Sequence, residues 1–569
     1  MKKQSFVLSA IILTLGGFFA KAIGALYKIP LTNILGSSGM GVYYLIFPIY
    51  SLIITFCSSG ISVALSTEIA KCRKIRHHYN EQKLLRVSLY LSFVLSLIFG
   101  AVLIIFAKNI SYAQGNVNAS IGYIAIAPSI IISSLIATVR GYFQGIENMV
   151  PTTVSMIIEQ IIKLSVGLVL AHKLCVFGIE YAVLGAILGV TISEVIALII
   201  IVINFVSYKG QLFYNYRNLG YKSKKKLLVK PSIKSTIKHK KSSISSNYKV
   251  LVTNSKYIRY STAVATKKLL KLAIPCTFSS ILIPVSTMLD SFMIINILTK
   301  SGYSLALSTS LYGIWGGVIQ SLISLPTIIV SAIATSLVPS LSGLLVKNDT
   351  NEIRKKVTFF IKLTWVLSIM MFVLFYVFAE DILRFLYGDG LDVSVIDELY
   401  YATKMLKLSS LTIIYYAFLQ TFTAILQTIG KSSVPVFALL VAIVIRTALI
   451  YGLVSIININ IFGAIIANIV FLSVADIILA YSIHKKIDLN YRFFDNLLKP
   501  MLIGLVILIG SSLVHSALKE FLNYILSSLI VGVLIVVIYL FLIYFGKVFS
   551  EKELDSLRKR KKLSKKQCD

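Results

Sequence analysis

The stretch RGYFQGIENMVPTTVSMIIEQIIKL (residues 140–164) has a counterpart in the second half of the chain, TAILQTIGKSSVPVFALLVAIVIRTAL (residues 423–449). Each copy contains a Gln, then a turn with a Gly, then a Pro that opens an apolar segment. A basic residue follows the Gln by nineteen positions in both copies, Lys163 in the first and Arg446 in the second. Recurrence of a related stretch indicates an internal repeat, so the sequence predicts two related halves.

Apolar segments flank both copies and continue along the whole chain. Of the 569 residues, 57% are hydrophobic and only 14% are charged, whereas a soluble domain has about 25% charged residues. A run of about 20 apolar residues is long enough to cross a bilayer as a helix. The sequence therefore predicts an all-α polytopic membrane protein with about fourteen spans, near 5–29, 40–63, 84–107, 119–140, 151–171, 181–206, 269–296, 306–345, 357–379, 401–428, 434–455, 461–484, 498–517 and 522–546.

The spacing of the segments divides the chain into five regions. Both copies of the repeat follow an even number of spans, so the two halves are expected to have parallel topology and to face one another across a central cleft. Such an arrangement is typical of alternating access. The regions are an N-terminal six-helix lobe (1–206), a basic cytoplasmic linker (207–268), a C-terminal six-helix lobe (269–484), two additional helices (485–546) and a basic cytoplasmic tail (547–569).

The net charge of +33 is carried mainly by the short polar gaps between spans. This placement is typical of cytoplasmic loops and argues against a nucleic-acid partner. It places both termini in the cytoplasm and predicts that the linker and the tail touch anionic lipid headgroups. The five cysteines have no metal or redox spacing, no nucleotide-binding or zinc motif is present, and neither a cofactor nor a metal is expected.

Several ionisable residues lie within the apolar segments, where a charge costs about 2.5 to 3.5 kcal/mol and usually faces a cavity or a partner. Basic side chains suit phosphate or diphosphate groups. The candidate substrate-binding residues are Lys21, Lys28, Glu159, Lys163 and Arg446. The candidate ion-coupling residues are Glu194, Asp290 and Asp476.

Some of these residues also have simpler interpretations. Lys28 could extend to the outer headgroups, and Asp290 could lie in water at a helix end. Glu159 and Lys163 are four residues apart and could neutralise each other on one helix. Prolines within the spans could form static kinks or hinges, and bending is expected first in the seventh span, between Pro275 and Pro284.

Two motifs resemble a known family. The stretch ILTLGGFFAKAIGALYKIPLTNILGSSGMGVYYLIFPIYSLIITFCSSGISVALSTEIAK (12–71) is similar to the N-terminal signature of the stage V sporulation protein B and polysaccharide-exporter group. PTTVSMIIEQIIKL (151–164) is similar to the group's fifth-helix motif. The group includes MurJ-type lipid II flippases, and its superfamily, with paired six-helix lobes, also includes multidrug exporters of the MATE type.

The resemblance implies a function and site residues. It implies a flippase that moves undecaprenyl-diphosphate-linked sugars across the bacterial cytoplasmic membrane, with the C-terminal helices forming a groove for the lipid tail. Lys21 matches an essential basic cavity position of the family, and Lys28 lies one position past another, where this chain has Tyr27. The family's sodium site uses acids in the seventh and eleventh spans. In this chain Asp290 matches the acid of the seventh span, and the eleventh span contains no acid.

The sequence therefore predicts a transporter, expected to act as a monomer, that translocates a lipid-linked wall, spore-cortex or polysaccharide precursor. Coupling to the membrane potential, to Na+ or to H+ stays open. Two alternatives remain: a multidrug or cation exporter of the same fold, and a membrane scaffold that recruits wall or spore synthesis machinery through its basic linker.

Overall fold

A computed structural model describes residues 6–74, 77–226, 259–345, 350–388, 398–487 and 497–549. In these residues thirteen helices are long and apolar enough to cross a membrane. Most of the predicted basic linker and tail lie outside the described residues. Helix α6 continues into the predicted linker as far as Lys226, and α8 begins at Thr262 before its predicted end.

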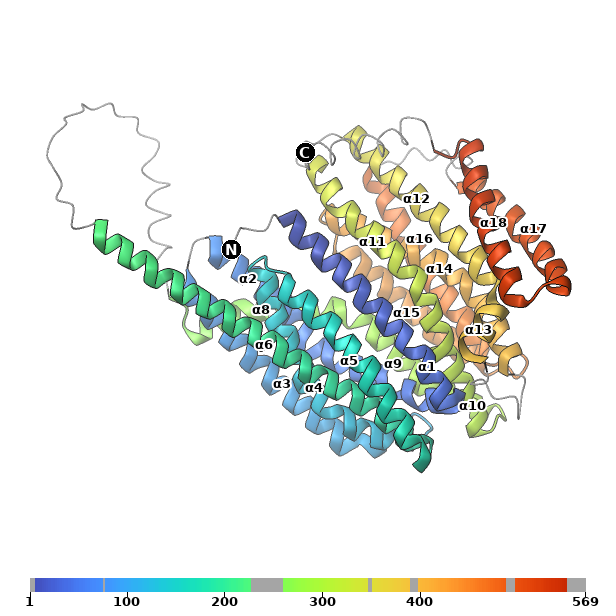
Figure 1. The fold of residues 1–569 in the computed structure, drawn as a ribbon, viewed down its shortest axis with the longest axis horizontal. Helices are drawn as coiled ribbons and strands as arrows, with labels where there is room; N and C mark the ends of the chain where they lie inside the picture. The colour runs from blue at the N-terminus through green and yellow to red at the C-terminus, as the bar shows by residue number, and fades with distance from the viewer. Residues whose placement is uncertain are drawn as a thin grey trace.

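Helices of the first half form one group in Figure 1, coloured from blue through teal to the green of α6. They are α1 (Phe6–Ile54), the π-helical turn η1 (Thr55–Ser59), α2 (Gly60–Lys74), α3 (His78–Ala113), α4 (Ala119–Gly145), α5 (Val150–Leu174), the 3-10 turn η2 (Cys175–Phe177) and α6 (Ile179–Lys226).

The second half begins with α8 (Thr262–Ser280), and α17 and α18 lie along the outer edge of its helices in Figure 1. Its elements are α8, α9 (Leu282–Lys300), α10 (Leu305–Gly313), the π-helical turn η3 (Ile314–Ile319), α11 (Gln320–Leu345), α12 (Thr350–Val377), α13 (Ala379–Tyr387), α14 (Glu398–Thr428), α15 (Ser433–Val454), α16 (Phe462–Ile487), α17 (Lys499–Phe521) and α18 (Tyr524–Phe545).

Helix α1 turns sharply at Gly36 and accounts for two of the expected spans. Its 49 residues would extend about 74 Å if straight, about two and a half times the thickness of a bilayer core. Gly36 has φ 65°, a left-handed conformation that glycine adopts without a steric penalty. The first part of α1 and the segment from Gly36 to α2 therefore cross the membrane separately.

The seventh expected span is broken, as the sequence predicted, between Pro275 and Pro284. Helix α8 ends at Ser280 and α9 begins at Leu282. Proline has no N–H to bond the carbonyl four residues earlier, here that of Ser280, which weakens the helix at this point. Helix α8 packs on α2 and α3, whereas α9 packs on α15 and α1, so the packing partners of this span change at the break.

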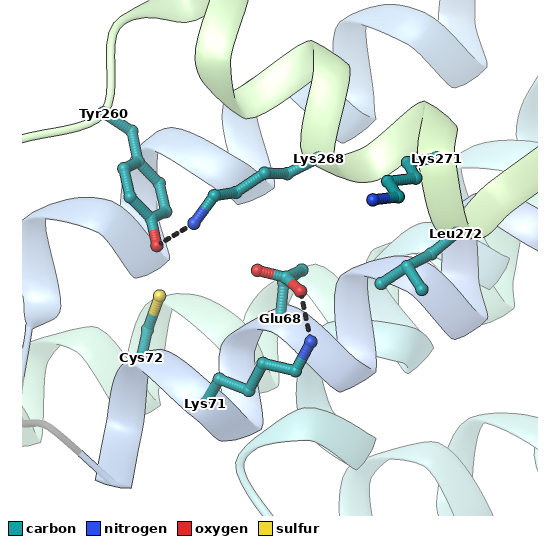
Figure 2. A pocket seen from close by; sticks show the side chains of 7 residues that line it. All are labelled: Glu68, Lys71, Cys72, Tyr260, Lys268, Lys271 and Leu272. Atoms are coloured by element: carbon teal, nitrogen blue, oxygen red, sulfur yellow. Dashed lines mark hydrogen bonds and ion pairs between the residues drawn. The ribbon is translucent and has the colours of Figure 1, made fainter.

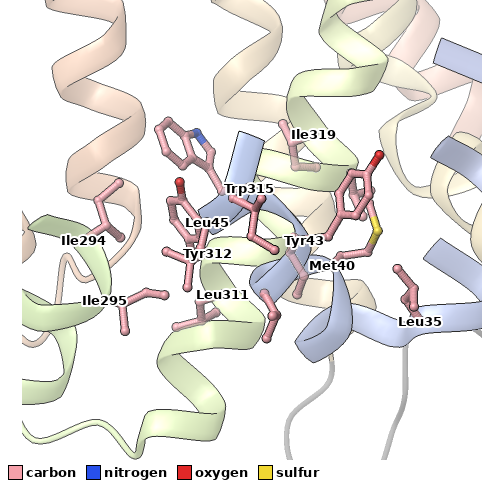
Figure 3. Close-up of a cluster of buried hydrophobic side chains, with 14 of the residues drawn as sticks. Leu35, Met40, Tyr43, Leu45, Ile294, Ile295, Leu311, Tyr312, Trp315 and Ile319 are labelled. Atoms are coloured by element: carbon pink, nitrogen blue, oxygen red, sulfur yellow. The ribbon is translucent and has the colours of Figure 1, made fainter. Parts of the chain in front are cut away.

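A dense apolar cluster joins the two halves at the end of the molecule where α10 meets the turn of α1 (Figure 3). Association of helices in lipid depends on close packing, and glycine permits it here. A Cβ placed on Gly313 of α10 would lie only 2.9 Å from the Cα of Gly41. The labelled side chains that meet in Figure 3 are Leu35, Met40, Tyr43, Leu45, Ile294, Ile295, Leu311, Tyr312, Trp315 and Ile319.

Polar contacts reinforce this junction, which we call the interlobe seal. The carboxylate of Glu398, at the start of α14, accepts hydrogen bonds of 2.7 Å from Ser37 of α1 and from Ser310 of α10. Gln114, after α3, donates to Ser291 of α9 at 2.9 Å. Because the bonds from Ser37 to Glu398 and from Gln114 to Ser291 link one half to the other, the structure represents a state closed at this end.

Candidate functional site

A cavity of about 410 Å³ lies between the two halves, directly against the interlobe seal. Helices α1 and α5 of the first half and α9, α10, η3, α11, α14, α15 and α16 of the second contribute to its wall. The lining residues are Lys28, Tyr43, Tyr44, Phe47, Pro48, Ser51, Lys163, Ile283, Ser286, Thr287, Asp290, Tyr312, Trp315, Gly316, Gln320, Tyr416, Arg446, Asn468 and Phe471.

Two lysines of the first half meet at this wall although they come from different helices. The ammonium of Lys28, on α1, lies 5.1 Å from the centre of the Tyr44 ring. That of Lys163, on α5, lies 5.2 Å and 5.4 Å from the rings of Tyr27 and Phe47. Aromatic faces attract a cation without neutralising it. In the described part of the chain neither lysine forms an ion pair with an acid, so both charges can attract an anion.

Arg446 supplies the third cation, from α15 of the second half. Its guanidinium donates to Asp290 of α9 at 2.6 Å and to Ser286 at 2.5 Å. Arg446 and Asp290 are only 5% and 4% exposed. Among the described residues, the buried Nε–H of Arg446 has no hydrogen-bond partner. Asp290 is thus buried and paired, and the interpretation that it lies in water at a helix end is wrong.

Lys21 lies outside the lining of this cavity. It precedes Lys28 by seven residues, which is nearly two helical turns, so the two share a face of α1 about 10 Å apart. The side chain of Lys21 is exposed. The structure therefore places Lys21 beyond the cavity, toward the N-terminus of α1, and its role as a substrate contact stays a prediction.

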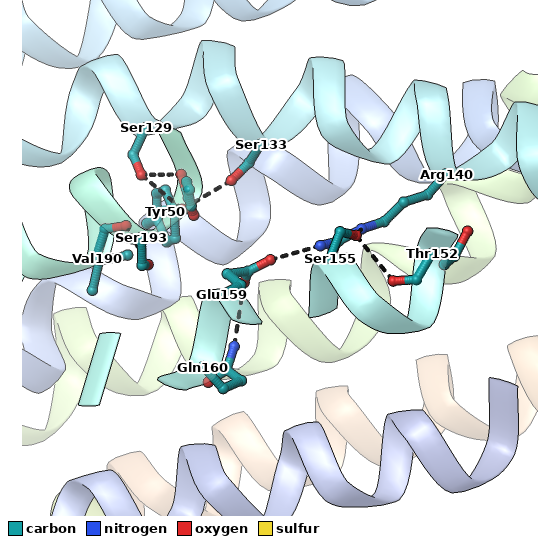
Figure 4. A network of polar contacts seen from close by, with 11 residues as sticks. Tyr50, Ser129, Ser133, Arg140, Thr152, Ser155, Glu159, Gln160, Val190 and Ser193 are labelled. Atoms are coloured by element: carbon teal, nitrogen blue, oxygen red, sulfur yellow. Dashed lines mark hydrogen bonds and ion pairs between the residues drawn. The ribbon is translucent and has the colours of Figure 1, made fainter. Parts of the chain in front are cut away.

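Glu159 lies on the same helix as Lys163 but pairs with another cation. Arg140 of α4 donates to Glu159 at 2.8 Å and to Ser155 at 2.9 Å (Figure 4). The suggested neutralisation of Lys163 by Glu159 is therefore not what the structure shows. Arg140 opens the repeat stretch at residue 140, but only the fold reveals that it faces α5.

Glu194 of α6 lies in a separate buried network of hydroxyl groups. Tyr50 and Ser129 both donate to its carboxylate, and the Tyr50 hydroxyl also lies 3.3 Å from that of Ser133. Figure 4 shows Tyr50 between these serines of α4. Tyr50 is one residue from the cavity wall at Ser51, so Glu194 lies behind the wall, outside the cavity itself.

Asp476 of α16 is 6% exposed, and neither carboxylate oxygen has a hydrogen-bond partner among the described residues. It is not part of the cavity lining. The structure thus brings Lys28, Lys163, Asp290 and Arg446 together and separates Lys21, Glu159, Glu194 and Asp476 from them. The aromatic and amide groups of the wall, such as Trp315 and Asn468, carried no signal in the sequence that distinguished them from ordinary packing residues.

Among known proteins, the family model of the polysaccharide biosynthesis protein matches residues 6–345, and the MatE model matches residues 275–452. Stage V sporulation protein B of Bacillus subtilis (strain 168) is 22% identical over 525 residues, which cover 92% of this chain and 91% of that protein. Lipid II flippase MurJ of the same organism is 22% identical over 469 residues, covering 80% and 78%.

The fold also has solved counterparts. The structure of lipid II flippase MurJ in an inward closed conformation superposes with a TM-score of 0.65 at 14% identity, covering 95% of this chain and all of that one. An inward-facing MATE family multidrug transporter gives a TM-score of 0.62 at 15% identity, covering 82% and 94%. The fold expected from the sequence is confirmed, and because the first family model matches more than half of the chain, this multi-pass membrane protein belongs to the polysaccharide biosynthesis protein family.

Proposed function

We propose that this protein is a flippase that translocates diphosphate-linked sugar precursors of a polyprenyl lipid across the bacterial cytoplasmic membrane by alternating access. The carrying observation is the cavity between the halves. Its lining residues include three cations, Lys28, Lys163 and Arg446, and one acid, Asp290. Two positive charges are therefore in excess at its wall. Its relatives, stage V sporulation protein B and the lipid II flippase MurJ, support the same assignment.

In this proposal the charged headgroup occupies the cavity while the polyprenyl tail stays in lipid. Ammonium groups act as point charges for phosphate oxygens, and a guanidinium can donate two bonds to one phosphate. Lys21, exposed on the same face of α1, would meet the headgroup before it reaches Lys28. The aromatic rings of Tyr44, Phe47 and Phe471 would face the sugars.

The transport cycle follows from the two structural joints. The interlobe seal closes one end, and the break at Ile281 lets α8 and α9 tilt separately. Opening of the seal, with approach of the halves at the other end, would expose the headgroup to the opposite side. By the distribution of basic loops, the sealed end faces outward and both termini lie in the cytoplasm.

We propose that the membrane potential, inside negative, supplies the driving force. Moving one charge through 100 mV is worth about 2.3 kcal/mol. An inside-negative potential favours outward movement of an anionic headgroup and inward movement of the cationic cavity when it returns without substrate. A resident sodium ion at Asp290 is disfavoured because Arg446 already neutralises that carboxylate at 2.6 Å. We further propose that the protein is monomeric and that its basic linker and tail contact anionic lipid headgroups.

The test is precursor translocation in cells that carry Lys163→Gln or Arg446→Gln at normal protein level. Retained full activity of both variants would exclude the cationic cavity as the substrate site. Mass spectrometry of the undecaprenyl-linked intermediate that accumulates on depletion would identify the sugar.

Export of drugs is the second candidate, favoured by the MatE match over residues 275–452 and by the aromatic lining of the cavity. Organic cations would, however, meet two excess positive charges at the wall. Altered drug tolerance of a deletion strain with normal wall precursors would favour this candidate. A scaffold role would instead predict complete loss of function on deletion of 222–250 with normal insertion of the spans.

A further inference from the structure

A second cavity, of about 370 Å³, lies between α2 and α8 and shares no lining residue with the central one. Figure 2 shows Lys268 and Lys271 extending from α8 over the side chains of α2. Its lining residues are Glu68, Lys71, Cys72, Tyr260, Lys268, Lys271 and Leu272. The flippase function proposed above makes no use of it.

The charge of this cavity is strongly positive. Three lysines face a single acid, Glu68, which is buried and accepts a 2.7 Å bond from Lys71. Lys268 donates to the phenol of Tyr260 at 2.6 Å, a neutral partner. Within the described residues Lys271 forms no ion pair. Among the described residues, two positive charges therefore remain without an acid at the wall of this cavity, which all three lysines line.

The outer face of α8 shows what kind of anion fits. Lys271, Ile274 and Phe278 follow at intervals of three and four residues, so they lie along one face of the helix. Ile274 is 51% and Phe278 64% exposed. Basic side chains at the end of a membrane helix, followed along the same face by exposed apolar ones, match the headgroup and acyl regions of a bilayer in that order.

We propose that the α2–α8 cavity binds an anionic phospholipid, with the headgroup phosphate among Lys71, Lys268 and Lys271 and the acyl chains along Ile274 and Phe278. The ligand chemistry is a phosphate ester that carries apolar chains. The site is independent of the flippase assignment. It differs from a contact of the linker and tail with headgroups because Lys71 and Lys271 lie outside both regions, and Lys268, the last residue of the predicted linker, belongs to helix α8.

Such a lipid would bridge two helices whose relationship matters for movement. Helix α8 belongs to the broken seventh span and packs on α2 and α3 of the first half, while α9 beyond the break packs on α15. A phosphate held by lysines of both α2 and α8 fixes α8 to the first half. Bending at Ile281 is then confined to α9, and the lipid stabilises the hinge in the arrangement seen here.

The test uses the purified full-length protein in detergent, titrated with phosphatidylglycerol and, separately, with phosphatidylcholine, and analysed by native mass spectrometry. Wild-type protein is expected to retain one phosphatidylglycerol in preference to phosphatidylcholine. Lys268→Gln with Lys271→Gln should weaken this retention about fivefold for each lysine removed. The matched control Lys267→Gln removes the same charge from the same helix outside the cavity lining and should leave retention unchanged.

Further variants keep the test decisive. Glu68→Gln removes the one acid and should tighten retention, an increase that a misfolded protein would not give. If the double variant does not fold, the single exposed change Lys271→Gln replaces it. Equal retention by the double variant and by Lys267→Gln would overturn the proposal, since the attraction would then be diffuse. Retention of farnesyl diphosphate but not of phosphatidylglycerol would also overturn it, because the site would then select the substrate's chemistry.

Discussion

Arg446 on α15 and Asp290 on α9 form a buried ion pair of 2.6 Å on the wall of the central cavity. The two residues are 156 positions apart in the chain. In the closed state the carboxylate of Asp290 is bonded to the guanidinium of Arg446, which the proposed diphosphate would also need to contact. If the proposed function holds, we predict that Asp290 holds the place of a substrate phosphate and that binding of the diphosphate opens this pair.

Asp290→Asn tests this competition. The neutral amide leaves Arg446 buried without a counter-ion, a change that typically costs about 3 to 5 kcal/mol, so the empty protein should melt at a lower temperature. Farnesyl diphosphate should then raise the melting temperature more than in wild type, because it supplies the missing anion.

Ser286→Ala is the control for the Asp290 variant. It removes a hydrogen bond to Arg446 but keeps the competing carboxylate, so the rise caused by farnesyl diphosphate should equal that of wild type. An equal or smaller rise in Asp290→Asn would show that Asp290 only positions Arg446.

Glu398→Ala should loosen the interlobe seal, because one carboxylate oxygen accepts bonds from both Ser37 and Ser310. Spin labels at Phe177 and Ile457, which are exposed beyond α5 and α15, would report the separation of the halves after replacement of the native cysteines. The distance distribution should shift to longer values, while Glu380→Ala, at a half-buried glutamate of α13 outside the interlobe seal, should leave it unchanged. An unaltered distribution in Glu398→Ala would contradict a role in closure.

Gly313→Ala should destabilise the same seal through packing. The added Cβ would lie 2.9 Å from the Cα of Gly41, so α1 and α10 would have to separate. Gly452→Ala offers a matched control in α15, since nothing lies within 4 Å of its added Cβ, and it should be neutral or stabilising by up to about 1 kcal/mol. Thermal unfolding compares the two, and equal melting temperatures would refute close packing at this crossing.

The outer helices α17 and α18 are tied to α13 by a charged cluster. Asp381 of α13 lies 2.5 Å from both Lys519 and His515 of α17 and accepts a bond from Ser528 of α18. Burial would raise the pKa of Asp381, but the hydrogen bonds from Lys519 and Ser528 outweigh it and hold the pKa below its ordinary value of 3.8.

This cluster predicts a pH dependence in acid. A depressed carboxyl pKa contributes stability that is fully present above the unfolded-state value near 4 and is lost as the pH falls through the lower folded-state value. Thermal unfolding of wild type should therefore lose this contribution below about pH 4, whereas Asp381→Asn should melt lower at pH 7 and lack this part of the acid loss. Parallel melting curves for both proteins from pH 7 to pH 3 would count against the cluster.

Apolar runs were sufficient to predict the membrane-spanning helices, but not the short helix α13, which lies in a gap between two predicted spans. The broken seventh span followed from Pro275 and Pro284, because the effect of proline on a helix is local. The turn of α1 at Gly36 was harder to place, since only the φ of 65° distinguishes it from the other glycines of the segment.

The site was predictable in part for the same reason. Lys163 and Arg446 were identified by their position in the repeat and by their cost in a bilayer. Their partners were not, because Asp290 reaches Arg446, and Arg140 reaches Glu159, only through packing between helices. Two residues that pair across different helices have no characteristic spacing in the sequence that would identify the pair.

The central claim is that the cations of the cavity carry a diphosphate headgroup. The most direct measurement is translocation of lipid-linked precursor in cells with Lys163→Gln, Arg446→Gln and the control Lys300→Gln, an exposed lysine at the end of α9, at equal protein levels. We expect translocation to fall about tenfold or more in each cavity variant, since a charge-assisted bond worth about 1.4 kcal/mol changes an equilibrium tenfold. Lys300→Gln should keep wild-type activity. Full translocation by both cavity variants would contradict it.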